Sequence, residues 1–158
     1  MPPNGHVSWS VPYKPGTLLA RAFDRTRKTI ATDTVQTTGA PAALRLQADR
    51  RTIVDDGEDV LPLAVSVVDT RGRVVPTASN MVTFSVIGPA EIVGVGNGDP
   101  SDHSPDKANR RRAFNGRCLA LVGAGTGRGR IVVTARGPGL KSATFVIRSV
   151  AGHIAEVK

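Results

Sequence analysis

A single cysteine, Cys118, is present among the 158 residues, so no internal disulfide can form and the core must be held together by packing. Because apolar residues follow it, we interpret Cys118 as a small buried hydrophobe. Long apolar runs are also missing, since no stretch approaches the roughly 18 consecutive apolar residues of a membrane helix. Residues 1–6 lack the charged and apolar regions of a signal peptide. The sequence therefore predicts no membrane partner and leaves the native compartment open.

Aromatic residues are scarce, at 4% of the chain, whereas positive charge is in excess, with a net charge of +8 and a pI of about 10.8. Arginines outnumber lysines sixteen to five and are scattered over turns and strand exteriors, with one run at residues 110–112. A basic chain can bind nucleic acid by neutralising phosphates. Binding of single strands also uses aromatic stacking platforms, and none is visible here. We therefore predict no nucleic-acid partner.

Strand patterns dominate the chain. Hydrophobic residues make up 40% and charged residues 22%, which is typical of a globular domain. Short alternating runs of Val, Ile, Thr and Leu are separated by turn residues, and helical periodicity is nearly absent. The alternation places Phe84 and Phe145 inward. About seven short strands predict an all-β fold, an immunoglobulin-like β-sandwich over residues 42–150. The predicted strands are residues 44–48, 61–67, 82–86, 92–95, 118–122, 131–135 and 143–147.

Residues 1–38 form a separate segment that contains the only Trp and the only Tyr of the chain. It has strand-like pieces at 7–11, 17–23 and 29–37, too little to close a core, and we interpret it as the C-terminal strands of a preceding β-domain. Residues 39–41 contain Gly and Pro and are predicted to be a linker. Residues 151–158 are predicted to be a tail.

Motifs that carry chemistry are absent from the sequence. The glycine-rich segments 94–99 and 123–129 are not followed by the helix that a phosphate-binding loop needs, so both are interpreted as structural. The acidic cluster at residues 55–59 lies in a turn, where we expect solvated carboxylates with ordinary pKa values; weak cation binding is the alternative. Serine and histidine occur without the motifs of a hydrolytic triad. The sequence predicts no catalytic residue, no cofactor and no metal site.

The segment from residue 96 to residue 117 is unusually long for a loop of a β-sandwich. Its polar side chains could bind a cation, a sugar hydroxyl or a neighbouring domain, although their spacing matches no Ca²⁺ loop. Trp9, Tyr13 and Phe114 are the aromatic residues that could stack on a sugar. The candidate residues for an interdomain contact or a ligand are Asn97, Asp99, His103, Phe114 and Asn115.

Two segments are distinctive: Asn97-Gly98-Asp99-Pro100, and the run KANRRRAFNG at residues 107–116. With the strand patterns around them, they resemble the last immunoglobulin-like domain of bacterial β-galactosidases of glycoside hydrolase family 2. The sequence WSVPYKPGTL at residues 9–18 resembles the closing strands of a C-terminal β-domain in that family. The resemblance covers nearly the whole chain.

The resemblance implies a multidomain parent that hydrolyses terminal β-galactosides. Such a parent has a sugar-binding jelly roll, an immunoglobulin-like domain, a (β/α)₈ barrel with two catalytic glutamates, and further C-terminal β-domains. No barrel motif occurs in this chain, so no catalytic residue is carried over. We therefore predict a non-catalytic accessory module whose partners are the other domains of the parent, with a carbohydrate-binding module as the alternative. The resemblance is compatible with a periplasmic or secreted parent and does not predict an oligomeric state.

Overall fold

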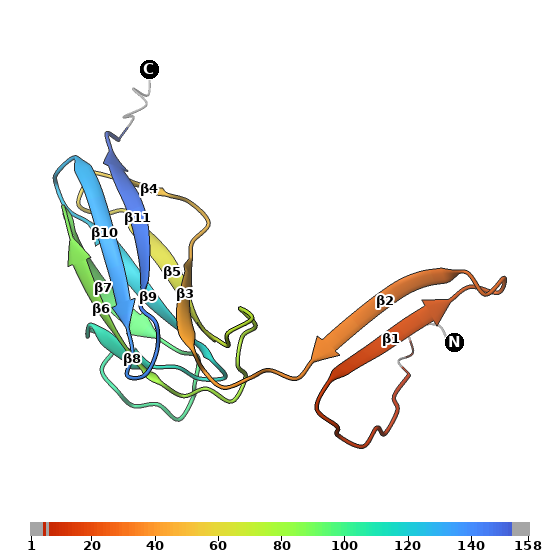
Figure 1. Ribbon diagram of the computed structural model, residues 1–158. Helices are drawn as coiled ribbons and strands as arrows, with labels where there is room; N and C mark the ends of the chain where they lie inside the picture. Colours follow the sequence, from red (N-terminus) through yellow and green to blue (C-terminus); the bar gives the residue numbers. More distant parts are fainter. Residues whose placement is uncertain (1–4, 6, 153–158) are drawn as a thin grey trace. The chain divides into compact units, whose positions relative to one another are not determined.

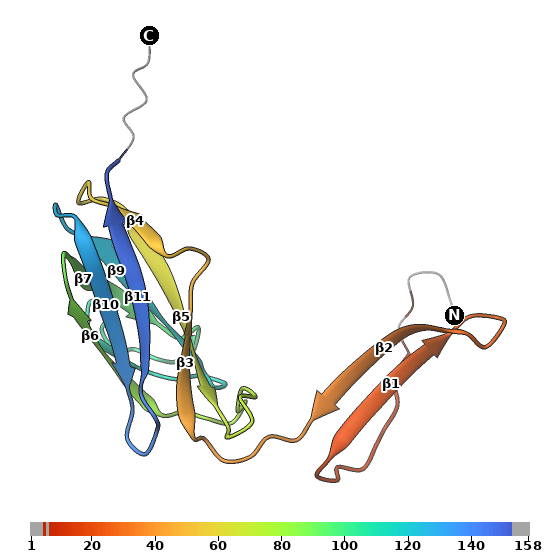
Figure 2. The same ribbon diagram turned by 45° about the horizontal axis from the view of Figure 1, so that its top comes forward.

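The computed structural model describes residue 5 and residues 7–152, and the chain divides into two compact units, Met1–Thr37 and Thr38–Lys158 (Figures 1 and 2). Both units are built from strands, and no helix in the described ranges is long and apolar enough to cross a membrane. The predicted tail lies outside the described residues from residue 153 onward.

The N-terminal unit is an antiparallel hairpin of β1 (Thr17–Phe23) and β2 (Thr29–Gln36). Asp24 closes its turn, because its carboxylate accepts hydrogen bonds from the backbone amides of Thr26 and Lys28. Large apolar side chains of this hairpin are exposed to solvent, and they include Leu18, Phe23, Ile30 and Val35. An isolated two-stranded hairpin has marginal stability in water. The described part of this unit therefore has little core of its own.

The predicted strand at residues 7–11 is wrong, since these residues have no strand conformation. An alternating sequence forms a strand only where a neighbouring strand supplies hydrogen-bond partners, and the described part of this unit pairs only β1 with β2. Pro12, directly after the run, also lacks a backbone donor.

The second unit is a sandwich of a five-stranded sheet, in the order β4-β11-β10-β6-β8, and a four-stranded sheet, in the order β3-β5-β9-β7 (Figure 1). Neighbouring strands are antiparallel except β4 and β11, which are parallel. The strands are β3 (Ala43–Gln47), β4 (Thr52–Val54), β5 (Val60–Val68), β6 (Met81–Ile87), β7 (Ala90–Gly96), β8 (Arg110–Arg112), β9 (Arg117–Ala124), β10 (Gly129–Arg136) and β11 (Ala143–Val150).

Side-chain alternation fills the space between the two sheets. On β5, every second side chain is fully buried, from Leu61 to Val67. The opposite sheet contributes Phe84, Ile131 and Phe145, and each large apolar side chain buried in this way contributes about 1.5–3 kcal/mol. The predicted all-β, immunoglobulin-like sandwich is confirmed, as are the buried positions of Phe84, Phe145 and Cys118.

Two of the nine strands in the sandwich were not predicted, and both have three residues. β4 pairs with the end of β11, where Thr52 lies opposite Arg148. β8 pairs with the start of β6, where Arg111 lies opposite Val82. A run of three residues is too short to show the period of a strand, and three consecutive arginines resemble a solvated loop.

The segment that enters the sandwich is fixed by Asp69, a buried residue. The Gly39 amide donates to Asp69 Oδ2 over 2.9 Å, and the amides of Arg71 and Arg73 donate to Oδ1. These hydrogen bonds, Gly39 first, and the Arg73 guanidinium hold the pKa of Asp69 well below its usual range. The predicted linker residue Gly39 is thus bonded to the body of the sandwich.

Candidate functional site

The segment from residue 96 to residue 117 connects the two sheets at one end of the sandwich. β7 ends at Gly96 in the four-stranded sheet, and β8 begins at Arg110 in the five-stranded sheet, so residues 97–109 cross from one sheet to the other (Figure 1). The predicted long loop is therefore a loop of 13 residues, a short strand and a tight turn.

Arg111 is the central residue of this segment. Although it lies between two exposed arginines, it is only 2% exposed. Its guanidinium donates to Asp102 Oδ2 over 3.1 Å, to the carboxylate of Asp106, and to the carbonyl oxygens of Val95 and Pro105 over 3.1 and 3.2 Å. Because a charge is buried in proteins only where it is paired and hydrogen-bonded, this network ties the loop to β7 and β8.

The two carboxylates that face Arg111 differ in their surroundings. Asp102 is largely buried and also accepts hydrogen bonds from the Ser104 amide, over 2.9 Å, and from Asn97 Nδ2, over 2.7 Å. The hydrogen bonds from Ser104 and Arg111 lower the pKa of Asp102 well below its usual range, so it is ionised at neutral pH. Asp106 is exposed, and water screens its ion pair with Arg111.

The predicted candidate residues have different places in this arrangement. Asn97 belongs to the network, because it donates to Asp102 and to the Arg112 carbonyl oxygen. Asp99 accepts a hydrogen bond from the Ser101 amide, and its own amide donates to Asn97 Oδ1. His103 and Phe114 are exposed. The structure thus brings Asn97 and Asp99 together and leaves His103 and Phe114 at the surface.

Asn115 lies in the tight turn between β8 and β9. The amide and carbonyl groups of Phe114 and Arg117 bond to each other over 2.8 and 2.9 Å, and Asn115 and Gly116 both have positive φ, 49° and 73°. Positive φ at both central residues is the type I′ hairpin turn, for which Asn-Gly is the preferred sequence. The Asn-Gly pair was a signal for this turn.

The buried position of Arg111 was not predicted from the sequence. Arg111 and Ala113 are both buried, whereas Arg110 and Arg112 are exposed, so the segment has the alternation of an edge strand. That alternation was the available signal. The charge of Arg111 hid it, because a buried arginine is rare unless a carboxylate is placed beside it.

The acidic cluster at residues 55–59 differs from the predicted solvated turn. Arg50 donates two hydrogen bonds to the carboxylate of Asp59, both 2.7 Å long, and Arg128 donates to Asp55 over 3.0 Å. The Arg50 hydrogen bonds lower the pKa of Asp59 from 3.8 to about 2. Asp56 accepts hydrogen bonds from the amides of Glu58 and Asp59, which lower its pKa as well. The expectation of ordinary pKa values was wrong for Asp59, because Arg50, nine residues away, folds back onto it, and for Asp56, because two backbone amides bond to its carboxylate.

Replacing Asp59 with asparagine is expected to lower the free energy of unfolding by about 1–2 kcal/mol at pH 7, because the Arg50 guanidinium loses a bidentate, charge-assisted partner. The folded-state pKa of Asp59 lies below its ordinary value, so the pair stabilises the fold above pH 4 and this stabilisation is lost as the pH falls towards 2. Urea unfolding of the variant and the unaltered chain, at pH 7 and towards pH 2, measures the difference in the free energy of unfolding. Glu58→Gln, an exposed neighbour, is the control, and an equal loss in both variants would contradict the assignment.

The described residues contain neither a metal-ligand cluster nor a reactive thiol. No group of three His, Cys, Asp or Glu side chains there could hold a metal ion. Cys118 is buried, and burial raises the pKa of its thiol to about 12, so it is not a nucleophile at neutral pH. The hydrogen bonds around Arg111 hold the loop of residues 97–109 in place and leave its outward-facing side chains exposed.

Comparison with known proteins identifies the sandwich. Residues 44–146 match the model of glycoside hydrolase family 2 C-terminal domain 5. The chain belongs to this family. The predicted resemblance to the C-terminal region of family 2 glycoside hydrolases is thereby confirmed.

Relatives of this chain are much longer proteins. A β-galactosidase of Bacteroides ovatus is 37% identical over 91% of this chain, and a β-glucuronidase of Formosa agariphila is 31% identical over 94%. The crystal structure of a family 2 glycosyl hydrolase from Bacteroides cellulosilyticus is 36% identical over 90% of this chain, with a TM-score of 0.86. The chain spans 17%, 15% and 18% of these relatives, respectively.

Proposed function

We propose that this chain is a non-catalytic accessory module at the C-terminal end of a family 2 glycoside hydrolase that acts on terminal β-galactosides. The observation that carries the proposal is the coverage: 91% of this chain matches 17% of a β-galactosidase. In a protein of that length the catalytic groups lie in the remaining part. The role of the module is then to pack against its neighbours.

Two features of the structure support a packing role. Exposed apolar side chains on the β1–β2 hairpin, such as Phe23 and Ile30, need cover from another part of a β-domain. The loop of residues 97–109 is held rigidly from within by Arg111 while His103 at its surface is exposed, so it can meet a neighbouring domain without first becoming ordered. We propose the five predicted candidate residues as part of that contact, with Asn97, Asp99 and Asn115 setting its shape.

The test is a binding measurement between the two parts of the enzyme. The full-length hydrolase is truncated before this module, and the purified 158-residue chain is added back and titrated by calorimetry. We expect the double variant His103→Ala/Phe114→Ala to bind at least about fivefold more weakly, because an interface side chain that matters contributes about 1 kcal/mol or more. Its own thermal unfolding should change little, because His103 is exposed and Phe114, at 38% exposure, is only partly packed.

The matched control is Glu58→Ala/Thr126→Ala, two exposed positions in the connections β4–β5 and β9–β10. It should bind as tightly as the unaltered chain. Deletion of residues 98–113 is not a suitable test, because it would remove β8 and Arg111 together with the loop and so disturb the fold as well as the contact. Equal binding by the His103→Ala/Phe114→Ala chain, or hydrolysis of a chromogenic β-galactoside by the isolated chain, would overturn the proposal.

A further inference from the structure

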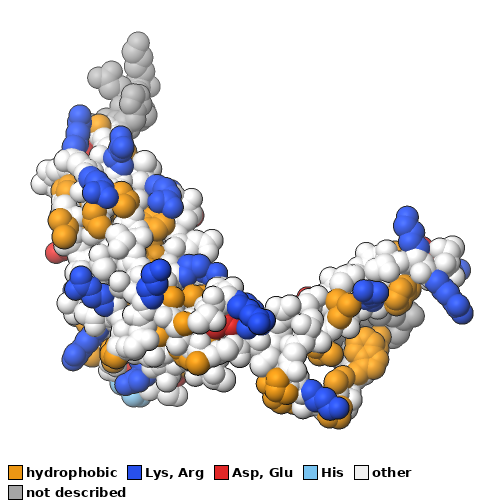
Figure 3. All heavy atoms as spheres, viewed as in Figure 1, with side chains coloured by type: hydrophobic (Ala, Val, Ile, Leu, Met, Phe, Trp, Pro, Cys, Tyr) orange, Lys and Arg blue, Asp and Glu red, His pale blue; other side chains and the backbone are white. Residues whose placement is uncertain are grey.

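The charged side chains on the outer face of the five-stranded sheet are all positive. Its five strands contain six arginines and no aspartate or glutamate. Arg111 is buried on the inner side, and the other five arginines are exposed. Figure 3 shows Lys and Arg side chains spread over the face of β10 and β11, with hydrophobic side chains between them.

The strand register places the side chains of this face in rows. Arg130, Arg148 and Thr52 lie opposite one another across β10, β11 and β4. The other two rows run across β6, β10 and β11, at about 6.6 Å intervals because successive residues on one face are two positions apart. The second row is Ile87, Val132 and Val146, and the third is Ser85, Thr134 and Thr144. Along the strands, the face thus presents first arginine side chains, then a strip of apolar side chains, and then hydroxyl groups.

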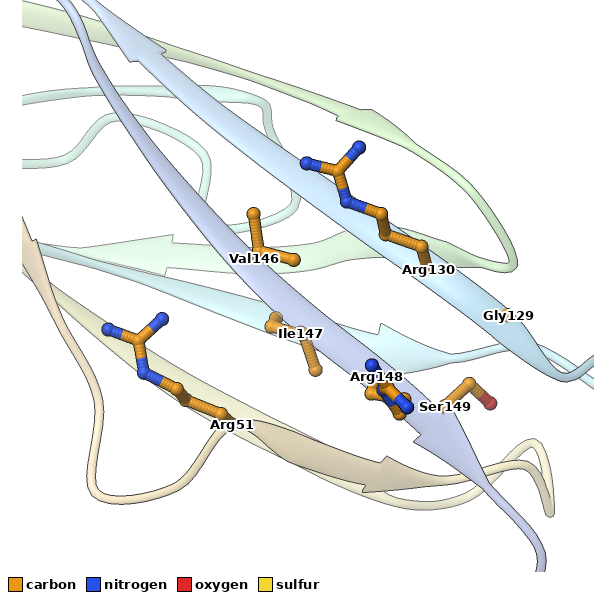
Figure 4. A pocket seen from close by; sticks show the side chains of 7 residues that line it. All are labelled: Arg51, Gly129, Arg130, Val146, Ile147, Arg148 and Ser149. Atoms are coloured by element: carbon orange, nitrogen blue, oxygen red, sulfur yellow. The ribbon is translucent and has the colours of Figure 1, made fainter.

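A hollow of about 510 Å³ lies at the cationic end of these rows, lined by Arg51, Arg130, Val146 and Arg148 among others. Figure 4 shows Val146 and Ile147 between Arg51 and Arg130, with Arg148 next to Ser149. The Arg51 guanidinium lies over the ring of Phe145, 4.6 Å from its centroid, and this cation–π contact holds it against a ring that is buried on the inner side of the sheet.

These three arginines have no carboxylate partner among the residues that the structure describes. Elsewhere in the sandwich, Arg50, Arg73, Arg111 and Arg128 each pair with an aspartate. Arg130 and Arg148 are directly opposite each other, an arrangement of like charges that destabilises a sheet. An oxyanion in the hollow would reduce this repulsion and accept charge-assisted hydrogen bonds from the guanidinium groups that turn toward it.

We propose that this hollow and the two rows beside it form a binding site for an acidic saccharide, in which the arginines hold a carboxylate or sulfate group. The ring of such a sugar would lie on Val132 and Val146, and its hydroxyls would reach Thr134 and Thr144. This proposal extends the proposed function and rests on it, because the choice of a saccharide as the ligand depends on the module being part of a glycoside hydrolase. The oxyanion chemistry rests on the arginines alone.

Other anionic partners fit this face less well. Nucleic acid binding uses aromatic stacking, whereas the described strands of this face expose no aromatic side chain, Phe84 and Phe145 being buried on the inner side. An acidic peptide would use the arginines and the apolar strip, but it does not need the row of hydroxyls. A sugar with an acidic group uses all three rows.

The experiment titrates the 158-residue chain by calorimetry at an ionic strength of about 0.15 M. The probes are trigalacturonate, neutral galactotriose, and two controls of the same charge, a capped triglutamate peptide and a short thymidine oligonucleotide. We expect saturable binding of trigalacturonate and at least tenfold weaker binding of the other three. Arg130→Gln/Arg148→Gln should weaken trigalacturonate binding by about tenfold or more, since one hydrogen bond to a charged group is commonly worth that factor.

A matched variant separates a site from diffuse attraction. Arg110→Gln/Arg136→Gln removes the same charge from exposed positions of the same sheet, outside the hollow. It should weaken binding less than about threefold. Absence of saturable binding, or equal weakening in the two double variants, would overturn the site. Equal or tighter binding of the peptide or the oligonucleotide would overturn the saccharide assignment. None of these outcomes bears on the docking of the module, which is measured with the truncated enzyme and the loop variants.

Discussion

Replacing Arg111 with methionine is expected to lower the free energy of unfolding of the sandwich by about 3–5 kcal/mol, the usual cost of removing one partner from a buried ion pair. Methionine retains the length and apolar character of the arginine stem, so the loss of stability measures the contribution of the guanidinium group. Without it, Asp102 is left largely buried with no cation, and the carbonyl oxygens of Val95 and Pro105 lose their donor. Asp106 contributes little to the cost because it is exposed.

Urea unfolding followed by circular dichroism measures the Arg111 effect, with Arg110→Met as the matched control on the same strand. Arg110 is exposed, so its variant should lie within about 0.5 kcal/mol of the unaltered chain. Backbone amide exchange should also become faster in residues 97–109, because the loop loses its internal anchor. A loss in the Arg111 variant no larger than that in the Arg110 variant would show that the buried pair does not hold the loop.

The sandwich could be predicted because its core follows from alternation within single strands. On β5, the side chains that fill the core are every second residue, and the same pattern places Phe84 and Phe145 inward on β6 and β11. The same reasoning failed for residues 7–11. There the alternation is present but no neighbouring strand pairs with it in the described part of the unit, and a local pattern carries no information about partners.

The site was harder to predict because its features depend on residues that folding brings together. Arg111 is buried because Asp102 and the Val95 carbonyl oxygen meet it, and Asp59 has a low pKa because Arg50 returns to it. Nothing in either local sequence specifies these contacts. The rows on the outer face likewise depend on the register of β4, β10 and β11, which places Arg130 opposite Arg148 although they are 18 residues apart. The role of the polar segment at residues 96–117 stays a prediction, and the structure supplies the internal contacts that the sequence could not specify.

Replacing Gly116 with alanine is expected to destabilise the sandwich by about 2–5 kcal/mol, through two separable effects. The first is conformational, because Gly116 has φ of +73°, and a residue with a Cβ pays about 1–2 kcal/mol in the left-handed region. The second is steric. A Cβ at this position would lie 2.2 Å from the Val75 carbonyl oxygen, which is backbone and cannot rotate away, so the turn must shift.

Gly139 allows the two effects to be measured separately, because it has nearly the same φ, +70°, and no atom lies within 4 Å of the place that an added Cβ would take. Gly139→Ala should therefore cost only the conformational part, about 1–2 kcal/mol. The difference between the two variants in urea unfolding is then the cost of displacing the Val75 backbone. The shift would also strain the hydrogen bonds from the Val67 amide to the Gly116 carbonyl oxygen and from the Gly116 amide to the Ala78 carbonyl oxygen, which tie this turn to β5 and the connection before β6. If Gly116→Ala costs no more than Gly139→Ala, the turn is compliant, and the rigid support that it gives to β8 and Arg111 must come from the loop network instead.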